Sequence, residues 1–91
     1  MRSENIAPTR SAVRERLADL INEIAAIPKD LIVEQATVDG TLQMQSVAFV
    51  ELQVAIEDEY QILIDPVHVV ELNSFGAIVD YVFECVVGGA A

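Results

Sequence analysis

The sequence predicts an all-α protein, a small antiparallel four-helix bundle with three main helices and one short helix. Three segments place apolar residues at the three- and four-residue spacing of one helix face. Proline, glycine and capping residues stand at the ends of these segments, where helices start and stop. We find no strand-like alternation and no internal repeat. The 91 residues are enough for one small domain.

The first helix is expected over residues 11–27. Its apolar positions share one face: Val13, Leu17, Leu20, Ile21, Ile24 and Ile27. Thr9 or Ser11 can cap the start, because a hydroxyl oxygen accepts a hydrogen bond from a free backbone N–H group. Pro28 disfavours helical geometry at the residue before it, so the helix ends near Ile27.

A long connection over residues 28–45 leads to the second helix. It holds five branched apolar residues: Leu31, Ile32, Val33, Val38 and Leu42. We therefore expect it to pack onto the helices, as long loops in small domains commonly do. Asp39-Gly40 marks a turn within it.

The second helix, expected over residues 46–60, carries two apolar stripes. The first stripe consists of Phe49, Leu52, Ile56 and Tyr60. The second stripe consists of Val47, Val50 and Val54, lies roughly 150° away around the helix, and is bordered by Glu51, Glu57 and Asp58. Either this second stripe is exposed as a surface for a partner protein, or both stripes are buried, one of them beneath the long connection.

Two further helices complete the predicted bundle. Asp65-Pro66 starts a short helix over residues 66–72, since proline is favoured in the first helical turn. Asn73-Ser74 caps a last helix that runs to Val87 and ends at Gly88-Gly89. Its apolar positions are Ile78, Val79, Val82, Val86 and Val87. We expect a flexible N-terminal tail over residues 1–10, one domain over 11–87 and a C-terminal tail over 88–91.

Charge is distributed unevenly along the chain. The net charge is −10, all five basic residues lie within the first 29 positions, and no Lys or Arg follows Asp30. An acidic surface of this kind repels phosphate backbones, which argues against nucleic acid as a partner. It attracts proteins with basic patches instead.

The single cysteine, Cys85, cannot form an intramolecular disulfide, which suits a reducing cytoplasm. No segment is apolar and long enough for insertion into a membrane, and no signal-peptide pattern follows Met1. We expect a cytoplasmic protein, with a monomer as the default state.

The residues offer neither a catalytic nor a metal site. A serine nucleophile needs a general base, and the only histidine, His68, has no orienting partner in the sequence. One histidine and one cysteine are too few for a zinc site, and there is no EF-hand or glycine-rich phosphate loop. Cys85 is interpreted as a small buried hydrophobic residue. We predict no enzyme activity.

Ser46, taken alone, is an ordinary N-cap before an apolar run. The stretch from Ala36 to Val82, however, resembles the acyl carrier protein family. That family has a serine at the start of its second helix, usually as Asp-Ser-Leu, followed by Val-Glu-Leu and an acidic helix that ends in an aromatic residue. The corresponding runs here are Gln45-Ser46-Val47, Val50-Glu51-Leu52 and Ala55-Ile56-Glu57-Asp58-Glu59-Tyr60. Ile64 and Asp65-Pro66 match the family's entry to a short third helix, and Ala77-Ile78-Val79-Asp80-Tyr81-Val82 resembles its last helix.

This resemblance implies a carrier of acyl groups. A phosphopantetheinyl transferase would attach the phosphopantetheine of coenzyme A to Ser46, and the thiol of this arm would hold acyl intermediates as thioesters. Acyl-transferring, ligating or condensing enzymes with basic patches would then dock on the second helix. The implied docking residues are Val47, Val50, Glu51, Val54, Glu57 and Asp58.

Three departures from the family pattern favour a specialised carrier for one fatty-acid, lipid or polyketide-type pathway. Gln45 replaces the usual aspartate, Val47 replaces the leucine, and Gln43 stands where a glycine is common. Gln45 also keeps open an unmodified carrier-like module for protein interaction. A peptidyl or aminoacyl carrier is a further alternative, although Gln43-Met44-Gln45-Ser46 lacks the Gly-Gly-(Asp/His)-Ser run of such carriers. An unrelated acidic helical adaptor also stays open.

Overall fold

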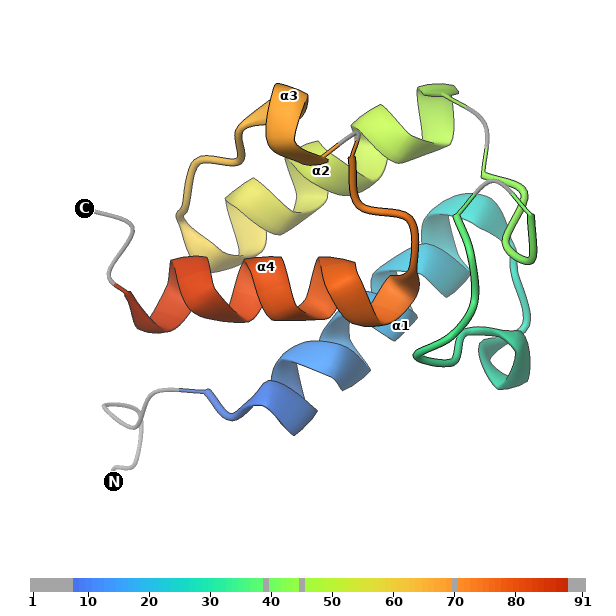
Figure 1. Cartoon of the computed structure of the whole chain (residues 1–91), viewed down its shortest axis with the longest axis horizontal. Helices are drawn as coiled ribbons and strands as arrows, with labels where there is room; N and C mark the ends of the chain where they lie inside the picture. Colours follow the sequence, from blue (N-terminus) through green and yellow to red (C-terminus); the bar gives the residue numbers. More distant parts are fainter. Residues whose placement is uncertain (1–7, 39, 45, 70, 89–91) are drawn as a thin grey trace.

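The computed structural model describes residues 8–38, 40–44, 46–69 and 71–88 (Figure 1). These residues form four α-helices, namely α1 (Arg10–Ala25), α2 (Ser46–Tyr60), α3 (Pro66–Val69) and α4 (Phe75–Val87), and one 3-10 turn, η2 (Lys29–Leu31). Helix α1 contacts both α2 and α4, and Figure 1 shows it crossing behind α4. Within the described ranges there is no β-strand, only an isolated bridge between Thr37 and Ser74. The predicted all-α bundle of three main helices and one short helix is confirmed.

The ends of α1 differ slightly from the prediction. The helix begins at Arg10 because Thr9, not Ser11, is the N-cap, and the Thr9 hydroxyl oxygen accepts from the Ala12 N–H group at 3.1 Å. It ends at Ala25, since Ala26 adopts a left-handed conformation with φ of 57°. The predicted N-terminal tail falls mainly on residues 1–7, outside the described residues.

The later helices follow their sequence signals closely. Helix α2 has the predicted bounds, and Ser74 caps α4 as expected by accepting from the Ala77 N–H group at 3.2 Å. Helix α3 ends at Val69, three residues before the predicted end at Leu72. Four residues are too few to give this element stability of its own, so it depends on contacts with its neighbours.

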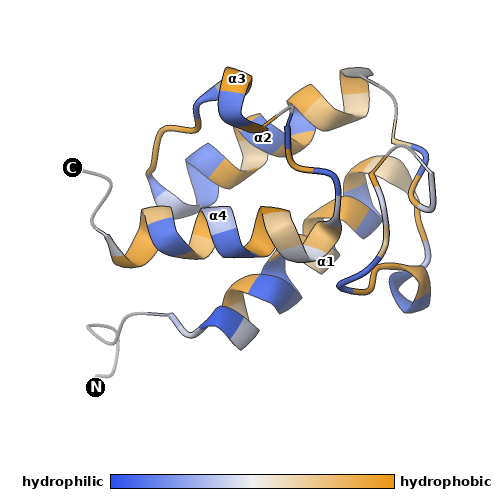
Figure 2. Cartoon of the chain, viewed as in Figure 1, coloured by the Kyte–Doolittle hydropathy of each residue, from blue (hydrophilic) through white to orange (hydrophobic). Residues whose placement is uncertain are grey.

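The predicted apolar faces of α1, α2 and α4 meet in one hydrophobic core, which is mostly aliphatic but includes the aromatic ring of Phe75. Its fully buried side chains are Val13, Leu17, Ile21, Leu52, Phe75, Val79 and Val82. Figure 2 shows hydrophobic and hydrophilic residues interspersed along α1, as expected of a helix with one buried face. Two predicted core positions are wrong or only partly right: Val87 is 48% exposed, and Val86 is half-buried, because α4 runs past the end of the core.

The long connection packs onto the helices, as predicted. Its backbone is joined to the start of α4 by three hydrogen bonds, Gly76 N–H to Glu34 O at 3.0 Å, Phe75 N–H to Ala36 O at 2.8 Å and Val38 N–H to Asn73 O at 2.9 Å. Its own residues Ile32, Ala36 and Leu42 are buried in the core. Leu31 and Val33, on either side of Ile32, take little part in this packing, with exposed fractions of 46% and 40%.

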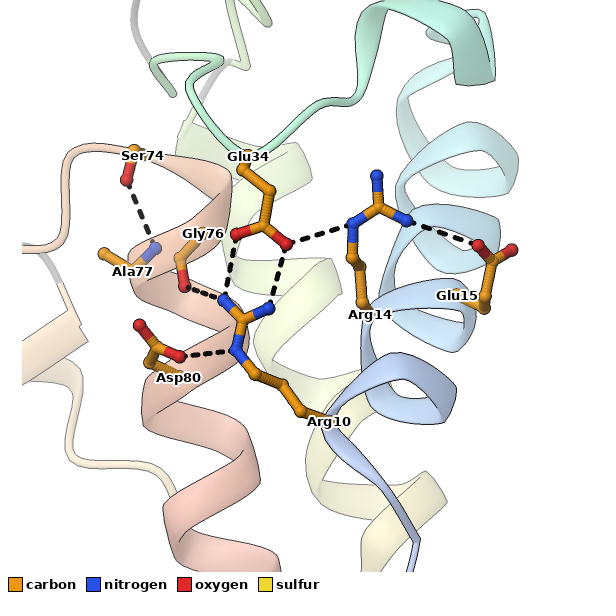
Figure 3. A network of polar contacts seen from close by, with 8 residues as sticks. All are labelled: Arg10, Arg14, Glu15, Glu34, Ser74, Gly76, Ala77 and Asp80. Atoms are coloured by element: carbon orange, nitrogen blue, oxygen red, sulfur yellow. Dashed lines mark hydrogen bonds and ion pairs between the residues drawn. The ribbon is translucent and has the colours of Figure 1, made fainter.

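A network of charged side chains joins this connection to α1 and α4 (Figure 3). The guanidinium group of Arg10 donates two hydrogen bonds of 2.9 Å to the carboxylate of Glu34 and one of 2.6 Å to Asp80. Arg14 adds an ion pair to Glu34 at 3.1 Å. These hydrogen bonds, those from Arg10 above all, hold the pKa of the Glu34 carboxyl below its usual range. The network fixes the connection that leads to the start of α2.

Candidate functional site

The start of α2 is the first part of the candidate site, since Ser46 is the first residue of that helix. Leu42 is buried just before it, and the Met44 N–H group donates to Val38 O at 3.0 Å. Between them, Gln43 adopts a left-handed conformation with φ of 51°. Glycine adopts this conformation without steric cost. Gln43 has a Cβ atom and so occupies a strained position.

A hollow of about 240 Å³ lies beside the first turn of α2. Its lining is formed by the end of α1 and the residues around the start of α2, namely Ala25, Ile27, Leu42, Gln43, Met44 and Ala48. All but Gln43 are apolar. Gln45, the predicted departure from the family pattern, lies outside the described residues.

The exposed face of α2 is the second part of the site. Leu52 and Ile56 are 1% and 2% exposed, whereas Val47, Val50 and Val54 are 70%, 56% and 58% exposed. The alternative that both stripes are buried is therefore wrong. In Figure 2 the N-terminal half of α2 is largely hydrophobic in colour, with hydrophilic residues toward its C-terminal end.

The acids along this face are not equivalent. Glu51 and Asp58 are exposed, and neither takes part in the ion pairs found among the described residues. Glu57 is half-buried, and its Oε2 atom accepts a hydrogen bond of 2.9 Å from the Ile64 N–H group. Its carboxylate thus anchors the chain after α2 as well as adding charge to the face.

The basic residues of the described chain are paired with other acids. Arg10 pairs with Glu34 and Asp80, and Arg14 pairs with Glu15 and Glu34. Arg16 pairs with Glu59, and Lys29 pairs with Asp19. Glu59 is the partner that lies on α2, and it pairs with Arg16 of α1 at 3.0 Å. The negative charge of Glu51 and Asp58 is thus left uncompensated by ion pairs within the described residues, which favours attraction of basic partner surfaces.

Comparison with known proteins gives this site a context. A family model described as a phosphopantetheine attachment site matches residues 15–82 of the chain. The chain belongs to this family of carrier proteins. It is also similar to a curated acyl carrier protein of Acidothermus cellulolyticus, with 30% identity over 77 residues, which cover 85% of this chain and 92% of that protein. The predicted resemblance to acyl carrier proteins is confirmed.

Membership of this family gives the protein a coarse function. It is a carrier protein with a phosphopantetheine attachment site, and it is not a catalyst. Such a carrier is modified by a phosphopantetheinyl transferase and interacts with the enzymes of its pathway.

The residues around the start of α2 fit a phosphopantetheine group. The first N–H groups of a helix have no partner within the helix, and the positive end of its dipole attracts a phosphate. The hollow beside Ala48 and Met44 offers apolar surface next to this phosphate position. One polar side chain and an otherwise apolar lining beside the helix start are compatible with an arm of amide and methyl groups.

Sequence reasoning missed two exposed apolar residues near α2. Leu63, in the connection after α2, is 84% exposed, and Val67 of α3 is 70% exposed. Ile62 and Ile64 on either side of Leu63 are 6% and 7% exposed. The signal that could have singled out Leu63 is the alternation of side chains along a locally extended backbone, which places neighbours on opposite faces.

His68 and Cys85 line a separate hollow of about 420 Å³ beside α4, together with Tyr81. The His68 and Tyr81 ring centroids are 4.8 Å apart, and burial raises the pKa of the Tyr81 hydroxyl. Cys85 is half-buried and packs against the hydrophobic core, so it is less buried than the interpretation as a small buried hydrophobic residue implies. Across the described part of the chain, no group of three His, Cys, Asp or Glu side chains could hold a metal ion. Likewise, none of the described helices has the length and hydropathy needed to cross a membrane.

Proposed function

We propose that the protein carries acyl intermediates as thioesters on a phosphopantetheine arm attached to Ser46. The observation that carries the assignment is the position of the two serines in the matched segment. Residues 15–82 contain two serines, Ser46 and Ser74. The hydroxyl oxygen of Ser74 accepts from the Ala77 N–H group at 3.2 Å and caps α4. Ser46 begins α2, where the family carries its modified serine.

When bound, the arm supplies a terminal thiol on which acyl groups are held as thioesters. The chain's own residues position it: the start of α2 stabilises the negative phosphodiester, and the hollow at Met44 and Ala48 contacts the part nearest to it. Because the described residues that line the hollow beside α2 include no general base, the bond-making chemistry belongs to partner enzymes.

The partners dock, in this proposal, on the exposed stripe of α2. Val47, Val50 and Val54 supply apolar contact, while Glu51 and Asp58 attract Lys and Arg residues of a partner. Glu57 adds charge and fixes the adjoining chain. The partners fitting such a face are acyl-transferring, ligating and condensing enzymes with basic patches.

A specialised fatty-acid, lipid or polyketide-type pathway is the setting we propose, with a monomeric protein in the cytoplasm. Gln43 and Gln45 support specialisation, because they replace a glycine and an acid that are common in this family. Gln45 also favours a second candidate function, an unmodified carrier-like interaction module.

Intact-protein mass spectrometry tests the attachment. The chain is incubated with coenzyme A and a broad-specificity phosphopantetheinyl transferase, beside a Ser46→Ala control. We expect a mass gain of one phosphopantetheine in the natural chain and none in the control. A gain that persists in Ser46→Ala contradicts the assignment of the serine.

The same assay separates a demanding carrier from an unmodified module. If the natural chain gains no mass, Gln45→Asp is loaded next under the same conditions. Modification of this variant assigns the failure to recognition by the generic transferase. Continued absence of modification favours the interaction module.

A further inference from the structure

The connection between α2 and α3 holds one apolar side chain outward on a fixed backbone. The Ile62 and Ile64 N–H groups donate to Glu57, the first to its carbonyl oxygen at 3.3 Å and the second to its carboxylate at 2.9 Å. The Asp65 N–H group donates to the Tyr81 hydroxyl oxygen at 3.1 Å. Ile62 and Ile64 are buried, whereas Leu63 between them is 84% exposed.

Leu63 lies beside a hollow of about 420 Å³ that continues the exposed stripe of α2. The hollow is lined by Val54, Glu57, Asp58, Gln61, Ile62 and Leu63. Val54 belongs to the exposed stripe, so the apolar surface extends from α2 across the hollow to Leu63. An exposed apolar residue next to a hollow is typical of a protein interface, while scattered single residues are not.

The charges around Leu63 indicate the chemistry of the partner. Asp58 is exposed on the wall of the hollow, Glu57 forms another part of it, and no Lys or Arg occurs from residue 30 to the end of the chain. A surface with this charge attracts a partner whose Lys or Arg residues surround an apolar depression.

We propose that Leu63 is an anchor residue that enters an apolar pocket, rimmed by Lys and Arg, on the phosphopantetheinyl transferase that modifies this carrier. Docking therefore extends beyond α2. The fixed backbone matters because an ordered anchor loses little conformational entropy on binding. A desolvated side chain at the centre of an interface commonly contributes a large share of the binding free energy. This inference rests on the proposed carrier function.

The test compares two leucines in the phosphopantetheinyl transferase reaction. Leu63→Gln removes the anchor, and Leu31→Gln is the matched control, because Leu31 is an exposed leucine on η2, outside the proposed surface. Initial rates of arm transfer from coenzyme A give kcat and KM for each chain. We expect KM to rise about tenfold for Leu63→Gln with kcat unchanged, and to stay within about twofold for Leu31→Gln.

Two further readouts identify the cause. Thermal unfolding of both variants should match the natural chain, since both side chains face solvent. Leu63→Gln changes no charge, and Glu57 and Asp58 remain. The salt dependence of kcat/KM should therefore match that of the natural chain, as it would for an anchor that acts through apolar contact.

Equal KM values for Leu63→Gln and the natural chain overturn the inference, as does an equal rise in Leu31→Gln. Either result leaves loading at Ser46 intact, so only the anchor is refuted. If neither the natural chain nor Gln45→Asp is loaded, the carrier function is refuted, and the anchor assignment with it.

Discussion

Glu57 has two roles that a matched pair of variants can separate. Its carboxylate accepts a hydrogen bond from the Ile64 N–H group at 2.9 Å in a half-buried position, whereas the neighbouring Asp58 is exposed. Hydrogen bonds to charged groups contribute about 1.5–3 kcal/mol and those between neutral groups about 0.5–1.5 kcal/mol. Glu57→Gln keeps an acceptor but loses the charge, so we expect the free energy of unfolding to fall by about 1 kcal/mol.

Asp58→Asn is the control, because it removes the same charge from the same part of α2. It involves no half-buried carboxylate, so its free energy of unfolding should change by less than about 0.5 kcal/mol. Since both variants relieve the same repulsion among acids, the difference between them reports the hydrogen bond to Ile64. Urea unfolding followed by circular dichroism measures it. Equal stability of the two variants, or a greater loss in Asp58→Asn, would refute this reasoning.

Three further changes have expected outcomes. Gly76→Ala places a methyl group 2.6 Å from the Glu34 carboxylate, which two hydrogen bonds from Arg10 hold in place, and 3.1 Å from the Glu34 backbone oxygen. An overpacking cost of about 2 kcal/mol exceeds the gain of about 1 kcal/mol in helix propensity, so we expect a lower melting temperature, and a higher one would contradict the contact. Gln43→Gly removes the strain of a left-handed backbone at a residue with a Cβ atom. After the entropic cost of glycine is subtracted, the free energy of unfolding should rise by about 0.5 kcal/mol, and a lower value in urea unfolding would argue against the strain. The Arg10 hydrogen bonds lower the pKa of Glu34 in the folded state, so its stabilising contribution is full above an unfolded pKa of about 4.3 and is lost as the pH falls through the folded value. The stability difference between the natural chain and Glu34→Gln should therefore shrink below about pH 4.3 in urea unfolding, and a constant difference would contradict the ion pair.

The helices could be predicted from the sequence because their signals are local. Each signal acts within a turn or two of its own helix. Examples are Pro28, the capping hydroxyls of Thr9 and Ser74, and the helical spacing of the buried residues Leu17 and Ile21 on α1 and Val79 and Val82 on α4. Helix α1 ends two residues before the predicted Ile27, and nothing in the sequence marks Ala26 as a left-handed residue. The exposure of Leu31 and Val33 does not follow from the sequence, because it depends on the path of the connection.

The candidate site divides in the same way. The two stripes of α2 follow from helical geometry. Whether the second stripe is exposed or lies beneath the connection depends on the path of the connection, so the sequence leaves both alternatives open. The structure shows that the second stripe is exposed. The hydrogen bond from Ile64 to Glu57 and the exposed position of Leu63 are tertiary features. Nothing in the composition of residues 61–65 separates Leu63 from its buried neighbours.

The most direct test of the carrier assignment is peptide mapping of the acylated chain. The chain is loaded from acetyl-coenzyme A with the transferase and cut by a glutamate-specific protease, because trypsin has no site after Lys29. Cleavage after glutamate places Ser46 in the peptide 35–51 and Ser74 in the peptide 72–84. We predict an acetyl-phosphopantetheine mass on the first peptide, with the acetyl group alone released by hydroxylamine. The same mass on the second peptide, or an acetyl group that resists hydroxylamine, would contradict a thioester carrier with its arm at Ser46.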